Sequence, residues 1–159
     1  MKPLKYWNSD KVAANYLFEL DKKNQIITLG LESLENFSNI SPAKKYEFFE
    51  GLWEYDVVEA FISTGEKSYI EINLSTTGAW WAAAFSDYRK RINSKQSIER
   101  KSIELEKVEI EKNKIIGTFS YKKIPFNDNY NVCAILDKKH LSLNSLDKEP
   151  DFHLKELRA

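Results

Sequence analysis

The feature of this chain that most constrains its fold is a period-two alternation of apolar and polar residues, which recurs in short runs. In the run YIEINL (69–74), the alternation places Tyr69, Glu71 and Asn73 on one face of a strand and three aliphatic residues on the other. Helical periodicity is scarce, and we find no internal repeat, linker or low-complexity segment. The pattern predicts a chain built of strands.

Polar turn signals separate about nine such runs. The runs cover residues 12–20, 25–34, 57–63, 68–74, 79–85, 102–110, 114–124, 131–136 and 141–146. The segments DKKN (21–24) and TGEK (64–67) have the composition of hairpin loops. Ser41 followed by Pro42 suits the cap and first turn of a short helix over residues 42–49. We therefore expect an all-β fold, an antiparallel sandwich or barrel with at most one or two short helices.

Length and charge limit the class of protein. The 159 residues suffice for one domain with a full core, so we expect a single domain over 1–159. The 24 basic residues are balanced by 24 acidic ones, which argues against a nucleic-acid partner and against adsorption to an anionic membrane. Cys133 is the single cysteine, so an intrachain disulfide and a zinc site of several thiolates are excluded.

The location of the protein is predicted from its start and its hydropathy. The beginning of the chain, MKPLKYWNSDK, is charged and lacks the apolar core of a secretory signal. No apolar run approaches the roughly 20 residues that a membrane-spanning helix needs. We expect a cytoplasmic protein.

Glu59 is the anomaly of the central run VVEAFI (57–62), in which both faces are largely apolar. A carboxylate there needs a partner or a wet cavity, because burying an unpaired charge costs several kcal/mol. If the two neighbouring runs form a hairpin, Glu59 shares a face with Glu71 and Asn73. Arg89 and Arg91 are the nearest cations in sequence that could reach these carboxylates.

Aromatic residues accompany these polar groups. Trp80 and Trp81 follow Asn73 by a few positions and precede three alanines. Tryptophans on sandwich strands commonly belong to the core, but flat rings beside carboxylates and amides also suit a sugar site. There the C–H face of a pyranose packs on a ring, while Asp, Glu, Asn and Arg bond its hydroxyls. Core and ligand platform both remain open for each tryptophan.

Three separated motifs in order resemble the bacterial DOMON-like domain related to family 9 carbohydrate-binding modules. They are LWEYDVVEAFI (52–62), YIEINLSTTGAWWAAAFSDYR (69–89) and PDFH (150–153), and they span about two thirds of the chain. The sequence departs from the family pattern at STTG (75–78), which lacks the usual proline, and in losing the histidine before PDFH. The resemblance implies a β-sandwich of jelly-roll or immunoglobulin-like build that binds a sugar or haem.

These observations together predict a non-catalytic domain that binds a small polar ligand on a concave sheet face, and we expect this ligand to be a carbohydrate. Rings would stack on the ligand, carboxylates, an amide and an arginine would bond its hydroxyls, and the PDFH motif adds two candidates. The candidate ligand-binding residues are Trp53, Glu59, Tyr69, Glu71, Asn73, Trp80, Trp81, Arg89, Asp151 and His153. No cofactor or metal is expected.

Four other hypotheses stay open. Haem could be held by His140 and His153, since imidazole pairs ligate haem iron. Calcium could be bound by the oxygens of NDN (127–129), although these residues also suit a turn. Glu59 and Glu71 could be the two carboxylates of a glycoside hydrolase. The domain could also be a protein-interaction module with an exposed aromatic patch or sheet edge.

Overall fold

The structure is a computed structural model and describes residues 1–6, 12–92 and 102–142. Strands dominate it, with one 3-10 turn, η1 (Leu52–Glu54). The strands are β1 (Lys2–Tyr6), β2 (Val12–Asp21), β3 (Ile26–Ser33), β4 (Val57–Ser63), β5 (Tyr69–Ser75), β6 (Trp80–Asp87), β7 (Lys90–Arg91), β8 (Ile103–Glu111), β9 (Lys114–Tyr121), β10 (Tyr130–Leu136) and β11 (Lys139–Ser142). Among the described residues, no helix is long and apolar enough to cross a membrane.

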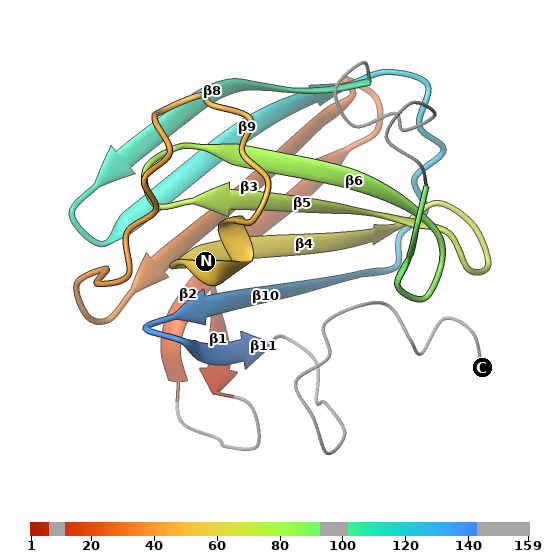
Figure 1. Cartoon of the computed structure of the whole chain (residues 1–159). Coiled ribbons are helices and arrows are strands. Elements are labelled where there is room, and N and C mark those ends of the chain that lie inside the picture. Colours follow the sequence, from red (N-terminus) through yellow and green to blue (C-terminus); the bar gives the residue numbers. More distant parts are fainter. Residues whose placement is uncertain (7–11, 93–101, 143–159) are drawn as a thin grey trace.

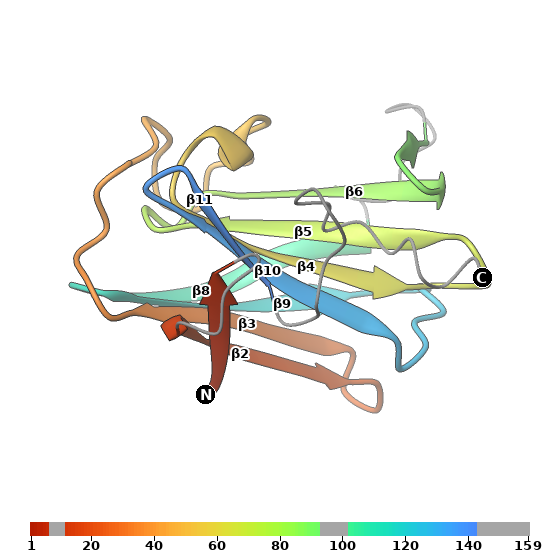
Figure 2. The same cartoon turned by 90° about the horizontal axis from the view of Figure 1, so that it is seen from below.

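Two antiparallel layers form a sandwich, as the alternation predicted (Figure 1). One layer has the order β7-β6-β5-β4-β10-β11, and the other has the order β1-β2-β3-β9-β8. Figure 2 shows β4, β5 and β6 lying over β2, β3, β8 and β9. Pairing of β1 with both β11 and β2 joins the layers into one continuous ladder.

The predicted hairpins are confirmed, because each turn joins two strands that pair in register. β2 and β3 flank residues 22–25, and the backbone N–H of Asn24 donates to the Asp21 carboxylate over 3.0 Å. β4 and β5 flank residues 64–68, and β8 and β9 flank residues 112–113. The sequence pattern missed two strands, β1 and β7. β7 is only two residues long, and β1 contains Pro3 between lysines.

The helix predicted over residues 42–49 is wrong. This segment forms turns and a single bridge in which Phe48 pairs with Trp80 at the start of β6. The backbone N–H of Phe49 donates to the carbonyl of Trp80, and the N–H of Trp80 donates to the carbonyl of Glu47. Docking on the sheet thus satisfies backbone groups that a helix would have paired internally, and tertiary contacts outweigh the local capping signal.

Alternation sorts the side chains of the central strands into two sets. The first set fills the space between the layers and includes Val58, Ala60, Ile62, Ile70, Ile72, Leu74, Trp80, Ala82 and Ala84. The second set lies on the outer face of the six-stranded layer, under the loop of residues 34–56. It includes Val57, Phe61, Tyr69, Trp81, Ala83, Phe85, Cys133 and Ile135, packed with Ala43 and Leu52 of the loop. The outer face is therefore partly covered, which leaves room for a pocket beside the loop.

Candidate functional site

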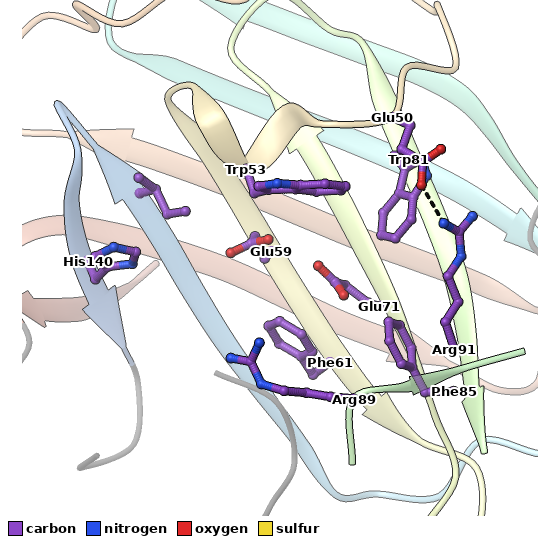
Figure 3. Close-up of a pocket in the computed structure, with 11 residues that line it drawn as sticks. Glu50, Trp53, Glu59, Phe61, Glu71, Trp81, Phe85, Arg89, Arg91 and His140 are labelled. Atoms are coloured by element: carbon purple, nitrogen blue, oxygen red, sulfur yellow. Dashed lines mark hydrogen bonds and ion pairs between the residues drawn. The ribbon is translucent and has the colours of Figure 1, made fainter. Parts of the chain in front are cut away.

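A pocket of about 530 Å³ opens on the outer face of the six-stranded layer, beside η1 (Figure 3). Strands β4, β5, β6, β10 and β11 supply its floor and one wall, while η1, the loop just before η1, β7 and the turn before β7 supply the rest. The lining residues are Glu50, Trp53, Glu59, Phe61, Glu71, Trp81, Phe85, Arg89, Arg91, Ile135 and His140. Aromatic rings therefore surround a group of carboxyls, with cations at the edge.

The carboxyls of Glu59 and Glu71 form the floor of the pocket. In the ladder of β4 and β5, Glu59 pairs with Asn73 and Phe61 pairs with Glu71, so the two glutamates are diagonal neighbours on one face. They are 3% and 5% exposed. Ala83 pairs with Glu71 from β6, and its short side chain keeps the space beside the carboxyl open. Strand register thus produces the shared face that the hairpin predicted.

Burial is the main reason that both carboxyls hold a proton more tightly than a carboxyl in water. It raises the pKa of Glu71 to about 7, although the neighbouring side chains of Glu59 and Asn73 and the charges of Arg89 and Arg91 act to lower it. The pKa of Glu59 stands well above its usual range, because burial and the negative charge of Glu71 both disfavour its ionisation. Near neutral pH the pair therefore holds at least one proton.

Polar groups beside this pair are buried without a hydrogen-bond partner among the described residues. Asn73 is 0% exposed, and within the described residues its amide makes no hydrogen bond of ordinary geometry. The amide nevertheless lies close enough to both carboxyls to lower their pKa. The indole N–H of Trp81, which pairs with Asn73 across the ladder, also lacks an acceptor there. Each such group costs about 1–3 kcal/mol, so a ligand that bonds them would bind favourably.

Trp53 offers an aromatic face to this space. Its side chain projects from η1 and is 41% exposed, and Figure 3 shows one flat face of the indole turned toward the two carboxyls. Its ring centroid lies 5.3 Å from that of Trp81, with the planes at 72°. The guanidinium of Arg91 lies 5.0 Å from the Trp81 ring centroid and forms an ion pair with Glu50. Trp81 is therefore already packed, and Trp53 is the better platform for a ligand.

Arg89 is positioned by its backbone. It has a φ of 55° in the turn between β6 and β7, a conformation that ordinary residues seldom adopt. Its backbone N–H donates to the Tyr69 hydroxyl over 3.0 Å. The Tyr69 ring stacks on Phe85 at 4.8 Å, with the planes nearly parallel at 4°. Tyr69, which we expected to stack on the ligand, is 1% exposed and supports the turn from below.

The adjacent residues Trp80 and Trp81 lie on opposite faces of the six-stranded layer. Neighbouring residues of a strand point to opposite faces, so Trp81 reaches the pocket and Trp80 cannot. Trp80 is 4% exposed between the layers, where its ring meets Phe48 and Phe119 edge-on at 4.8 and 5.8 Å. The prediction of Trp80 as a ligand-binding residue is corrected accordingly, because its indole is a core side chain.

The structure brings half of the predicted residues onto one pocket. These are Trp53, Glu59, Glu71, Trp81 and Arg89. Asn73 lies beside the floor but does not line the pocket. Asp151 and His153 lie outside the described residues.

Six lining residues were not among the predicted ones. Phe61 and Phe85 share the parity of Glu59 and Trp81 along their strands, so alternation alone could have found them. Arg91 was noticed as a nearby cation but not assigned to the site. Glu50, Ile135 and His140 come from the loop, β10 and β11, and only the tertiary arrangement brings these segments to the pocket.

The haem and calcium hypotheses can be compared with the described part of the chain. His140 lines the pocket, and burial lowers its pKa, so it is neutral near pH 7. Its proposed haem partner, His153, is outside the described residues. At the proposed calcium turn, Asn127 donates from its amide to the Ser63 hydroxyl and Asp128 pairs with Lys22 at 2.7 Å. Within residues 1–6, 12–92 and 102–142, no cluster of three or more His, Cys, Asp or Glu could hold a metal.

Comparison with known proteins supports the fold. No family model matches the chain, and no curated protein matches its sequence. Among solved structures, the chain is similar to one from Bacteroides uniformis described as a "putative carbohydrate-binding protein", with a TM-score of 0.69. The identity is 14%, and the match covers 98% of this chain and 82% of the other. The chain therefore shares its all-β sandwich with that protein.

Proposed function

We propose that this protein is a non-catalytic sugar-binding domain of the DOMON-like kind related to family 9 carbohydrate-binding modules. The observation that carries the proposal is the pocket itself, which sets the open face of Trp53 over the buried carboxyls of Glu59 and Glu71. A sugar ring has an apolar C–H face and a rim of hydroxyls, and this pairing of surfaces matches both.

Size and similarity support the same proposal. A volume of about 530 Å³ falls within the usual range for small-ligand pockets and suits one or two sugar rings. The similar structure from Bacteroides uniformis carries a carbohydrate-binding description, although at 14% identity the likeness concerns the fold. Arg89 lies at the edge of the pocket, where its guanidinium would bond an outer hydroxyl or an anionic substituent.

A thermal-shift screen of the whole protein tests the proposal. The panel contains neutral hexoses, hexosamines, disaccharides, haemin and calcium chloride. A ligand at a hundredfold excess over its dissociation constant adds about 2.7 kcal/mol to the native state, which raises the unfolding midpoint. A shift with one sugar class supports the proposal. A shift with haemin alone points to the haem alternative, and no shift with any sugar contradicts sugar binding.

Substitution of Trp53 then separates stacking from folding. Trp53→Ala should weaken binding of the sugar that scores in the screen by about 1–3 kcal/mol, because a half-exposed platform is lost. Its unfolding free energy should change little, since the ring is 41% exposed. Isothermal titration calorimetry measures the first effect and urea unfolding the second. The matched control is Ile110→Ala, an equally exposed apolar residue at 44% that does not line the pocket. Unchanged affinity in Trp53→Ala would rule out the platform.

A further inference from the structure

The floor of the pocket is rich in hydrogen-bond acceptors and poor in cations. Glu59 and Glu71 bring two carboxyls to the floor, where their side chains are 3% and 5% exposed, and Asn73 is fully buried beside the floor. Among the described residues, neither carboxyl forms an ion pair, although both are nearly out of solvent. Within the described part of the chain, both the oxygen and the nitrogen of the Asn73 amide lack a hydrogen-bond partner. Such a site is most stable when a cation with several N–H donors enters it.

The cations of the pocket do not fill this role. Arg91 pairs with Glu50 and covers the Trp81 ring. Arg89 leans on the Tyr88 ring, with 5.7 Å from its guanidinium carbon to the ring centroid. Both arginines act on Glu71 through their charge, yet burial outweighs them. Among the described residues, the positive charges at the edge therefore form no ion pair with the two floor carboxyls.

The chemistry of the floor distinguishes two ligand groups. A hydroxyl donates one hydrogen bond and carries no charge, so it leaves the carboxyl pair protonated. A primary ammonium donates three hydrogen bonds, which the oxygens of two carboxyls can accept, and its charge compensates an ionised carboxylate. The aromatic rings of Trp53 and Phe61 add attraction for a cation that they would not add for a hydroxyl.

Resting on the proposed sugar-binding function, we propose that the ligand is a sugar with a free amino group, whose ammonium binds between Glu59 and Glu71 beside Asn73. The ring of the sugar then packs under Trp53, and its remaining hydroxyls face the pocket edge. Binding makes or breaks no covalent bond of the sugar, but it releases the proton that the carboxyl pair holds when the pocket is empty. That proton goes to the buffer.

Other titratable groups face the carboxyl pair and could also exchange protons when the ligand binds. From the loop comes Glu50, from the β6–β7 turn and β7 come Arg89 and Arg91, and from β11 comes His140. β10 contributes Cys133, which pairs with Glu59 in the ladder and is buried. The His140 pKa is lowered, so its ring is neutral near pH 7. Proton release on binding therefore arises from the two glutamates.

Calorimetry with matched sugars tests this inference. The probes are three pairs that differ only at carbon 2: glucosamine and glucose, galactosamine and galactose, mannosamine and mannose. In at least one pair the amino sugar should bind about tenfold or more tighter than its hydroxyl parent. The binding heat should also differ between phosphate and Tris buffers at pH 7, because proton release transfers the ionisation heat of the buffer.

The outcomes separate the two proposals. Equal affinity within a pair, with no buffer dependence of the heat, overturns the ammonium site and leaves sugar binding standing. No binding by any of the six sugars overturns both proposals.

Variants give a second test that does not depend on the ligand screen alone. Glu59→Gln and Glu71→Gln keep the shape of the side chain and remove its charge, so each should reduce the preference for the amino sugar about tenfold. The matched control is Glu104→Gln on β8, an exposed residue that does not line the pocket and should keep the full preference. Thermal unfolding checks that each variant is folded. A folded Glu59→Gln/Glu71→Gln double variant that retains the preference would overturn the inference.

Discussion

The pKa of the Glu71 carboxyl depends on the position of this residue in the sheet. The same residue in an exposed loop would have a pKa near 4.5, whereas burial in β5 raises it to about 7. Strand alternation puts it on the pocket face, and register puts Glu59 at its side. The depth of the pocket, and not the residue type, makes this pair a unit that holds a proton near neutral pH.

This shift predicts a pH-dependent stability. Because the folded pKa lies above the unfolded one, the native state binds more protons than the unfolded state between about pH 4.5 and 7. The contribution of Glu71 to the free energy of unfolding is therefore greatest at low pH and falls as pH rises through that window. The loss is on the order of 3 kcal/mol for a shift of this size.

Urea unfolding of the wild-type protein and Glu71→Gln across this window measures the effect. The stability of the variant relative to wild type should increase from pH 4.5 to 7, since glutamine does not ionise. Glu104→Gln is the control and should run parallel to wild type, because its side chain is exposed. Parallel curves for Glu71→Gln as well would show that the carboxyl is compensated in the native state.

At the scale of elements, Asp56 holds two connecting segments, the loop of residues 34–56 and the β10–β11 turn, at the start of β4. It is 1% exposed, and its carboxylate accepts hydrogen bonds from the backbone N–H groups of Ser38, Asn39 and Asp137 over 2.7–3.1 Å. The first two belong to the loop that carries Trp53, and the third belongs to the β10–β11 turn. One side chain therefore anchors the loop that bounds the pocket.

Asp56→Ala should lower the free energy of unfolding by about 2–4 kcal/mol, because three backbone donors lose a charged acceptor at once. Chemical denaturation followed by tryptophan fluorescence measures the loss. Asp128→Ala is the matched control: its side chain is 93% exposed in a surface ion pair, so the expected change is below about 0.5 kcal/mol. Equal, small losses in both variants would contradict the anchoring role.

At the scale of the whole molecule, β1 is the strand that joins the two layers of the sandwich. It pairs with β11 on one side and with β2 on the other, so it connects the two layers through the backbone ladder. Leu4 is 0% exposed within the core between the layers. Although β1 has five residues, its removal from the ladder would expose an edge on each layer.

Leu4→Ala should therefore cost about 2–5 kcal/mol of stability, as for other fully buried leucines. Far-UV circular dichroism and tryptophan fluorescence should report one coincident urea transition, shifted to lower urea, because both layers unfold together. Leu34→Ala, at a site that is 62% exposed, is the control and should change stability by less than about 0.5 kcal/mol. A loss that small for Leu4→Ala, or two separate transitions, would contradict a shared cooperative core.

The sequence by itself determined the class of fold and the composition of each strand face. Period-two alternation depends only on neighbouring residues, so it correctly predicted an all-β antiparallel fold, the hairpins and the shared face of Glu59 and Glu71. The same local character explains the errors. The predicted helix over 42–49 had a capping signal, and the two missed strands, β1 with five residues and β7 with two, were too short to show a pattern.

Only the tertiary structure decided which face of the central layer is core and which is pocket. Alternation places Trp80 and Trp81 on opposite faces of the strand, but it does not indicate which segments cover each face. The second layer packs over Trp80, and the loop of residues 34–56 covers only part of the face that carries Trp81. Burial depends on segments distant in sequence, and with it come the raised pKa of the carboxyl pair and the presence of His140 in the wall. Local patterns cannot encode these long-range contacts.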